Sequence, residues 1–150
     1  MWNNVHDAYL ESQVLSQDPV ALVRLLYQGA IGAVQDARRH LSQGNIQARS
    51  GAISRAMEIL IELTSSLDRE QGGELALRLA QLYDYMRSRL LDANLQQSDE
   101  PLAEVLSLLA TLGEAWQAVE AQSRPAVEAA APWAQPVPEA ETHNEHAWSF

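Results

Sequence analysis

The sequence predicts an all-α protein: an antiparallel, up-and-down four-helix bundle with a flexible N-terminal segment and a disordered C-terminal tail. Apolar residues recur at helical spacing in four stretches of about 20 residues, joined by connections of only a few residues. No stretch between Pro19 and Gln122 is typical of a strand. The predicted organisation is an N-terminal segment over residues 1–17, the bundle over 18–124 and the tail over 125–150.

The first two helices are predicted over residues 19–41 and 46–67. Asp18 before Pro19 supplies an N-cap acceptor and a proline at the first helical position. Apolar residues cover roughly half of the first helix, wider than the ~100° stripe that one core contact needs. They are Leu22, Val23, Leu26, Tyr27, Ala30, Ile31, Val34, Ala37 and Leu41. The second helix is expected to place Ile53, Met57, Ile59, Leu60, Ile61 and Leu63 on one broad face.

The third and fourth helices are predicted over residues 74–95 and 99–124. Gly72-Gly73 is expected to end the connection before the third helix, and the fourth is expected to end near Arg124-Pro125. The third helix carries two apolar stripes, which predicts two contact surfaces. One stripe holds Leu75, Leu79, Leu82, Met86, Leu90 and Ala93, and the other holds Leu77, Ala80, Leu91 and Leu95. The fourth helix is expected to place Val105, Leu108, Leu109, Leu112, Trp116 and Val119 inward.

Composition excludes several classes of partner and chemistry. A formal net charge of -10 disfavours nucleic acid, because a polyanion needs a basic face. The chain has no cysteine, hence no disulfide, thiolate nucleophile or thiolate metal site. It has no apolar run of the roughly 18 to 20 residues that a bilayer span needs and no secretory signal, so no membrane insertion and a cytoplasmic location are expected.

No constellation of residues supports catalysis or a bound cofactor. Metal-carboxylate bundle enzymes use Glu-x-x-His pairs, and the only histidine in a predicted helix, His40, lies at a helix end. His143 and His146 in the tail form only a weak metal pattern. The sequence therefore predicts a protein that is not an enzyme and that has no cofactor or physiological metal.

Two glycines and three tyrosines indicate where helices or partners meet. Gly29 and Gly32 share a helix face and indicate close approach of another helix or a partner. Tyr27 and Tyr83 are expected in the core. Tyr85 lies off both apolar stripes of its helix and is the better candidate for a surface role.

An ordered series of blocks over roughly residues 9 to 120 resembles the flagellar secretion chaperone FliS family, the export chaperones of flagellin. The blocks are Tyr9 and Val14, residues 18–31, residues 59–68, Gly72-Gly73-Glu74, residues 79–86, Arg89-Leu90, Ala93-Asn94 and Glu114-Ala115-Trp116. The resemblance implies a four-helix bundle that binds the disordered C-terminal segment of newly made flagellin, prevents premature polymerisation and supports delivery to the type III export apparatus. It also implies that the N-terminal segment, through Tyr9, Leu10, Val14 and Leu15, covers part of the binding surface.

Helix geometry rather than matched family contacts supplies the other candidate binding residues. These are Ile31, Leu77, Ala80, Tyr85, Leu91 and Leu95. The export gate and a flagellar regulator are further candidate partners. The alternative function is a helical module that dimerises through its spare stripe or sequesters another flagellar protein.

The tail lies beyond the end of the resemblance and allows two interpretations. Trp133, Val137, Trp148 and Phe150 are either anchors without a partner in a solubilising acidic extension, which we favour, or residues that fold back and compete for the flagellin groove.

Overall fold

The computed structural model describes residues 18–129, with side chains described for residues 18–122. The predicted flexible N-terminal segment and all of the predicted tail after residue 129 lie outside the described residues. Within the described part, the regular elements are α2 (Pro19–Ser42), α3 (Ile46–Ser65), α4 (Arg69–Gln96) and α5 (Asp99–Ala129).

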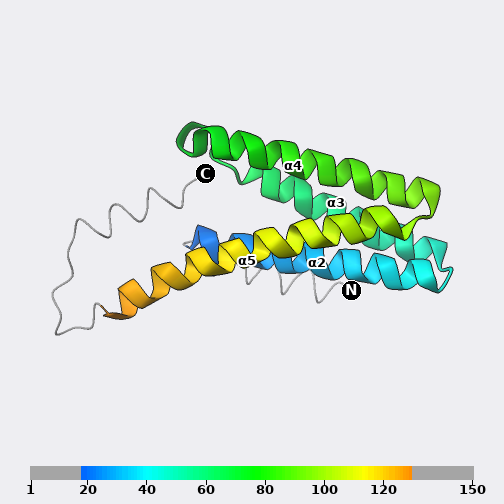
Figure 1. Ribbon diagram of the computed structural model, residues 1–150, viewed down its shortest axis with the longest axis horizontal. Coiled ribbons are helices and arrows are strands. Elements are labelled where there is room, and N and C mark those ends of the chain that lie inside the picture. The colour runs from blue at the N-terminus through cyan, green and yellow to red at the C-terminus, as the bar shows by residue number, and fades with distance from the viewer. Residues whose placement is uncertain (1–17, 130–150) are drawn as a thin grey trace.

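The four helices close into an antiparallel bundle, as predicted (Figure 1). Each helix packs against the next along the chain, and α5 returns to pack against α2. Ion pairs join the two ends of α2 to opposite ends of α5: Arg24 pairs with Glu120, and Arg38 pairs with Asp99. Helices α2 and α4 are therefore diagonal neighbours, as are α3 and α5.

Polar side chains fix the helix starts. The Asp18 carboxylate accepts a hydrogen bond from the Ala21 amide at 3.2 Å, and Pro19 occupies the first turn, which confirms the predicted cap. The Asn45 side chain accepts from the Ala48 amide at the start of α3. The Asp68 side chain accepts from the first two amides that follow Arg69 at the start of α4.

The structure differs from the prediction at two helix boundaries. The long part of α4 follows a break at Gly73, as predicted, but a capped helical turn that begins at Arg69 precedes the break and was not predicted. Gly73 has φ +53°, a backbone conformation that glycine adopts without steric cost, so the double glycine lies inside the element. Helix α5 passes Pro125 and ends at Ala129. A proline removes one backbone donor and can kink a helix without ending it.

The core lies between the inward stripes of all four helices. Its larger fully buried residues are Tyr27, Val34, Leu60, Leu63, Tyr83, Met86, Leu90, Leu102, Val105 and Leu109. Two residues predicted to face inward are exposed: Leu75 lies in the first turn after the Gly73 break, and Ile61 directly follows two apolar residues of α3. Three consecutive residues span about 200° of a helix, so they cannot all face one core.

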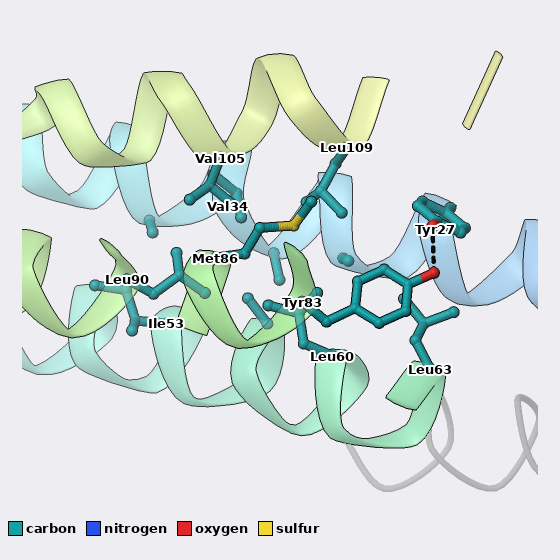
Figure 2. Close-up of a cluster of buried hydrophobic side chains, with 14 of the residues drawn as sticks. Tyr27, Val34, Ile53, Leu60, Leu63, Tyr83, Met86, Leu90, Val105 and Leu109 are labelled. Atoms are coloured by element: carbon teal, nitrogen blue, oxygen red, sulfur yellow. Dashed lines mark hydrogen bonds between the residues drawn. The ribbon is translucent and has the colours of Figure 1, made fainter. Parts of the chain in front are cut away.

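Tyr27 of α2 and Tyr83 of α4 meet within the core, on the side of the cluster near Leu63, as Figure 2 shows. Their hydroxyl oxygens are 2.5 Å apart, and the Tyr27 ring also lies beside Trp116 of α5. Burial raises the pKa of both hydroxyls above the ordinary value of 10.0. The unfolded chain ionises its tyrosines first, so stability falls as the pH rises above about 10.

We expect Tyr83→Phe to lower the free energy of unfolding by about 1 kcal/mol, because the buried Tyr27 hydroxyl would lose its hydrogen bond to Tyr83 while keeping the one with Trp116. Urea unfolding measures this loss. The double variant Tyr27→Phe with Tyr83→Phe should lose less than the sum of the two single variants. Strict additivity would show that the two hydroxyls do not interact.

The two glycines of α2 should respond differently to alanine. A Cβ at Gly32 would meet nothing within 4 Å, so Gly32→Ala should stabilise the bundle by about 0.5–1 kcal/mol through helix propensity. A Cβ at Gly29 would lie 3.3 Å from Ile59 Cδ1, so Gly29→Ala should gain less or destabilise. Equal urea midpoints for the two variants would contradict the close approach of α2 and α3 at Gly29.

Candidate partner-binding surface

The large apolar side chains that remain exposed lie on only two of the helices. Within residues 18–122 they are Ile46, Ile61, Leu75, Leu77, Tyr85, Leu91 and Leu95, with exposed fractions from 45% for Tyr85 to 81% for Leu95. All seven belong to α3 and α4, and none belongs to α2 or the described part of α5. The apolar surface is therefore concentrated on one half of the bundle.

Contacts with neighbouring helices show which way α4 is turned. Asn94 contacts α3, because its side-chain oxygen accepts hydrogen bonds from Arg49 and Ser50, both at 3.1 Å. Arg89 contacts α5 through Glu104. At 100° per residue, Leu77, Leu91 and Leu95 lie within about 40° of one another on the side of α4 next to α3. The predicted second stripe is thus a real exposed stripe.

Helix α3 presents two isoleucines toward the same side. Ile46 and Ile61 lie within about 40° of Ser50, the residue whose hydroxyl bonds to Asn94 of α4. We call the surface formed by Ile46, Ile61, Leu77, Leu91 and Leu95 the α3–α4 face. Ala80 lies between Leu77 and Leu91 on the same side and is only partly buried. Its small side chain leaves room along the middle of this face.

A pocket of about 660 Å³ opens at one end of the α3–α4 face. Its lining residues come from the end of α3, the connection and α4: Ile61, Thr64, Ser65, Leu67, Asp68, Arg69, Glu70 and Arg87. Ile61 and Leu67 supply apolar surface, and Arg69 and Arg87 supply guanidinium groups. Such a pocket can accept an apolar side chain together with a carboxylate.

Tyr85 lies on a different side of α4 from the exposed leucines. Its hydroxyl donates to Glu104 Oε1 at 2.8 Å, and Arg89 Nε donates to the same oxygen at 2.7 Å. These two hydrogen bonds, with the charge of Arg89, hold the pKa of the Glu104 carboxyl below its ordinary value. The bond to Glu104 raises the pKa of Tyr85. Tyr85 is exposed, as predicted, but it belongs to a polar contact between α4 and α5.

The remaining predicted binding residues are not among those that the structure places on the α3–α4 face. Ile31 of α2 is partly buried against the core, and its Cδ1 atom would lie 3.8 Å from a Cβ at Gly113 of α5. It therefore lies between α2 and α5, away from the α3–α4 face. Tyr9, Leu10, Val14 and Leu15 lie outside the described residues. The structure thus brings together Leu77, Ala80, Leu91 and Leu95, and separates Ile31 and Tyr85 from them.

Sequence reasoning missed three contributors to this surface. Ile61 could have been found, because the run Ile59-Leu60-Ile61 must turn one side chain outward. Ile46 directly follows the capping Asn45 and has no such signal. The buried Arg49, which bonds both the side chain and the backbone carbonyl of Asn94, depends on the register of α3 against α4. That register cannot be read from helical periodicity.

Other site types find no support among the described residues. No group of three or more His, Asp or Glu side chains in residues 18–129 is arranged to hold a metal ion. Within the same part of the chain, none of the helices is long and apolar enough to cross a membrane.

The Tyr85 contact predicts a measurable shift in the titration of Glu104. In Tyr85→Phe, the Glu104 carboxyl should titrate closer to 4.5, because one hydrogen bond to its charged form is lost. Carbon NMR of the carboxyl group measures this change. The contact stabilises the fold above pH about 4.5, and that contribution is lost as the pH falls through the lowered pKa of the folded state. An unchanged titration in Tyr85→Phe would contradict the bond.

Comparison with known proteins places these features in a family. The family model described as "Flagellar protein FliS" matches residues 1–123. The flagellar secretion chaperone FliS of Salmonella typhimurium is 42% identical over 111 residues, which cover 73% of this chain and 82% of that protein. The FliS protein of Escherichia coli is 35% identical over a stretch that covers 72% of this chain and 80% of that protein. The FliS protein of Campylobacter jejuni is 33% identical over 79% of this chain and 94% of that protein.

Proposed function

This chain belongs to the FliS family, and we propose that it acts as a cytoplasmic export chaperone that binds the C-terminal segment of flagellin on the α3–α4 face. The coarser role, a chaperone in flagellar export, follows from the family. The identity of the bound segment and the place where it binds are our proposal.

The observation that carries the proposal is the confinement of exposed large apolar residues to α3 and α4. A concentration of exposed apolar side chains on one part of a protein surface is typical of a protein-binding site. Amphipathic helices commonly bind such surfaces by inserting residues at helical spacing into a groove. A flagellin segment that forms helices on binding suits this surface.

The dimensions of the face agree with a helical client. Leu77 and Leu95 lie at the two ends of the exposed stripe, about 27 Å apart along α4 at 1.5 Å per residue. A partner helix of about 18 residues would cover this length. Ala80 gives it a place to approach closely, and the pocket beside Ile61 can accept one larger side chain.

The proposed mechanism is binding, without catalysis or a cofactor. Flagellin residues that would otherwise seed filament assembly become buried against Leu77, Leu91 and Leu95. Full burial of an exposed leucine contributes about 1.5–3 kcal/mol. Leu77 and Leu91 are already about half buried in the free protein, so each contributes about half of that, partly offset by the entropy lost when the segment becomes ordered. This offset allows a complex that is stable in the cytoplasm and still releases its client at the export apparatus.

We expect Leu77→Ala and Leu91→Ala each to weaken binding of the C-terminal segment of flagellin from the same genome by about fivefold to tenfold. The double variant should weaken it by about thirtyfold or more. Calorimetric titration measures these affinities, and the wild-type chain should show a negative heat-capacity change. Both leucines are about half exposed, so the free energy of unfolding should change by less than about 0.5 kcal/mol.

Leu75→Ala is the matched control. Leu75 is as exposed as Leu77 and lies on the same helix, but it is rotated about 200° from Leu77 and faces another side. Its substitution should change affinity by less than about twofold. If all variants bind like the wild type, the α3–α4 face is not the site. If the wild type does not bind flagellin at all, the proposed client is wrong.

A further inference from the structure

The chain continues beyond both the bundle and the family match. The family match ends at residue 123, and α5 ends at Ala129. The sequence alone favours a solubilising extension, but with the α3–α4 face in view we propose that residues 130–150 dock on that face beside Arg69 and Arg87 and compete there with the chaperone's client. The competition rests on the proposed function, whereas the docking itself does not.

The fold places the origin of this segment at the pocket's end of the bundle. Because the helices are antiparallel, α5 ends at the same end of the bundle where α3 ends and α4 begins (Figure 1). The pocket beside Ile61 lies at this end, since its lining includes the connection from α3 to α4. The segment therefore starts near one end of the α3–α4 face.

The segment is long enough to reach the whole face. An extended chain spans at most about 3.3–3.6 Å per residue, so Trp148 can lie up to about 60 Å from Ala129. The exposed leucines of α4 extend over about 27 Å. Its terminal aromatic residues can thus reach either the pocket or the leucines.

The chemistry of the segment complements that of the face. Residues 130–150 contain two tryptophans and one phenylalanine, Trp133, Trp148 and Phe150, together with Glu139, Glu141 and Glu145 and no lysine or arginine. Aromatic side chains bury large apolar areas, which suits a surface of leucine and isoleucine. No large exposed apolar residue on α2, or on α5 up to residue 122, offers an equivalent surface.

Arg69 and Arg87 of the pocket can pair with the glutamates of residues 130–150. The guanidinium of Arg87 donates only a long hydrogen bond, 3.4 Å, to Asp84 and is partly exposed. It can therefore donate to a second carboxylate. The pocket also contains two acids: Asp68, which accepts two backbone hydrogen bonds as the cap of α4, and Glu70, which is exposed. Arg69 is exposed at the pocket.

Paramagnetic labelling tests the docking directly and needs no client. The chain has no cysteine, so Ala147→Cys accepts a single spin label beside Trp148. We expect the label to broaden amide signals of residues 61–70 and 77–95 at least threefold more than those of α2. Equal broadening on all helices, no broadening, or broadening confined to α2 and α5 would overturn the proposal.

Charge variants provide the matched control for this measurement. Arg69→Gln with Arg87→Gln removes the two guanidinium groups of the pocket and should reduce the broadening by at least half. Arg38→Gln with Arg55→Gln removes the same charge where α2 pairs with α5 and with α3, and it should leave the broadening unchanged. Equal effects of the two pairs would show only a general attraction between the acidic segment and a basic surface.

The competition is tested with Trp148→Ala and Phe150→Ala together in the full chain. Freeing a blocked site raises the apparent affinity by the reciprocal of the fraction of time that the site was open. A site that the segment blocks about 80% of the time should therefore bind the flagellin segment about fivefold more tightly in this variant. Unchanged affinity would overturn the competition. If neither protein binds flagellin, the proposed function fails, and the broadening still decides whether the segment docks.

Discussion

The hydrogen bond between Tyr27 and Tyr83 is formed at only one rotation of α4 about its axis, and the binding surface depends on that rotation. The two residues join the diagonal helices α2 and α4 through buried hydroxyls. Because α4 carries two apolar stripes, its rotation about its own axis decides which stripe faces the core and which stays exposed. A rotation that buried Leu77 and Leu91 would take Tyr83 out of the core and leave the Tyr27 hydroxyl buried without this partner. The polar pair thus reinforces the arrangement in which the larger apolar stripe of α4 is buried.

The selected arrangement divides the bundle into two unlike halves. Ion pairs hold α2 to its neighbours, from Arg24 and Arg38 to α5 and from Asp36 to Arg55 of α3. The outer side of α4 next to α3 carries leucines instead. Since Asn94 fastens that side to Arg49 and Ser50, the exposed leucines and isoleucines lie on a surface whose backbone is held in place. A preformed apolar surface loses less entropy on binding than a flexible one.

Local signals in the sequence were sufficient to predict the helices. They failed for features that depend on contacts between helices. The cap at Asp18, the four helical stretches and the second stripe of α4 depend on spacing alone, so they could be predicted. The extra helical turn before Gly73 was missed, and its first amides bond to the side chain of Asp68. Tyr85 and Ile31 were grouped with the leucines because helical wheels describe each helix separately. Only the packing shows that Tyr85 bonds to α5 and that Ile31 lies between α2 and α5.

The central claim is that the apolar surface left exposed by this packing is where the client binds. Methyl NMR of leucine and isoleucine, recorded while the C-terminal segment of flagellin is added, tests it most directly. We predict the largest shifts at Leu77, Leu91, Leu95 and Ile61, with small shifts at the buried Leu60 and Leu90. Large shifts at Ile31 and Leu112 near the boundary of α2 and α5, with the exposed leucines of α4 unmoved, would contradict the account.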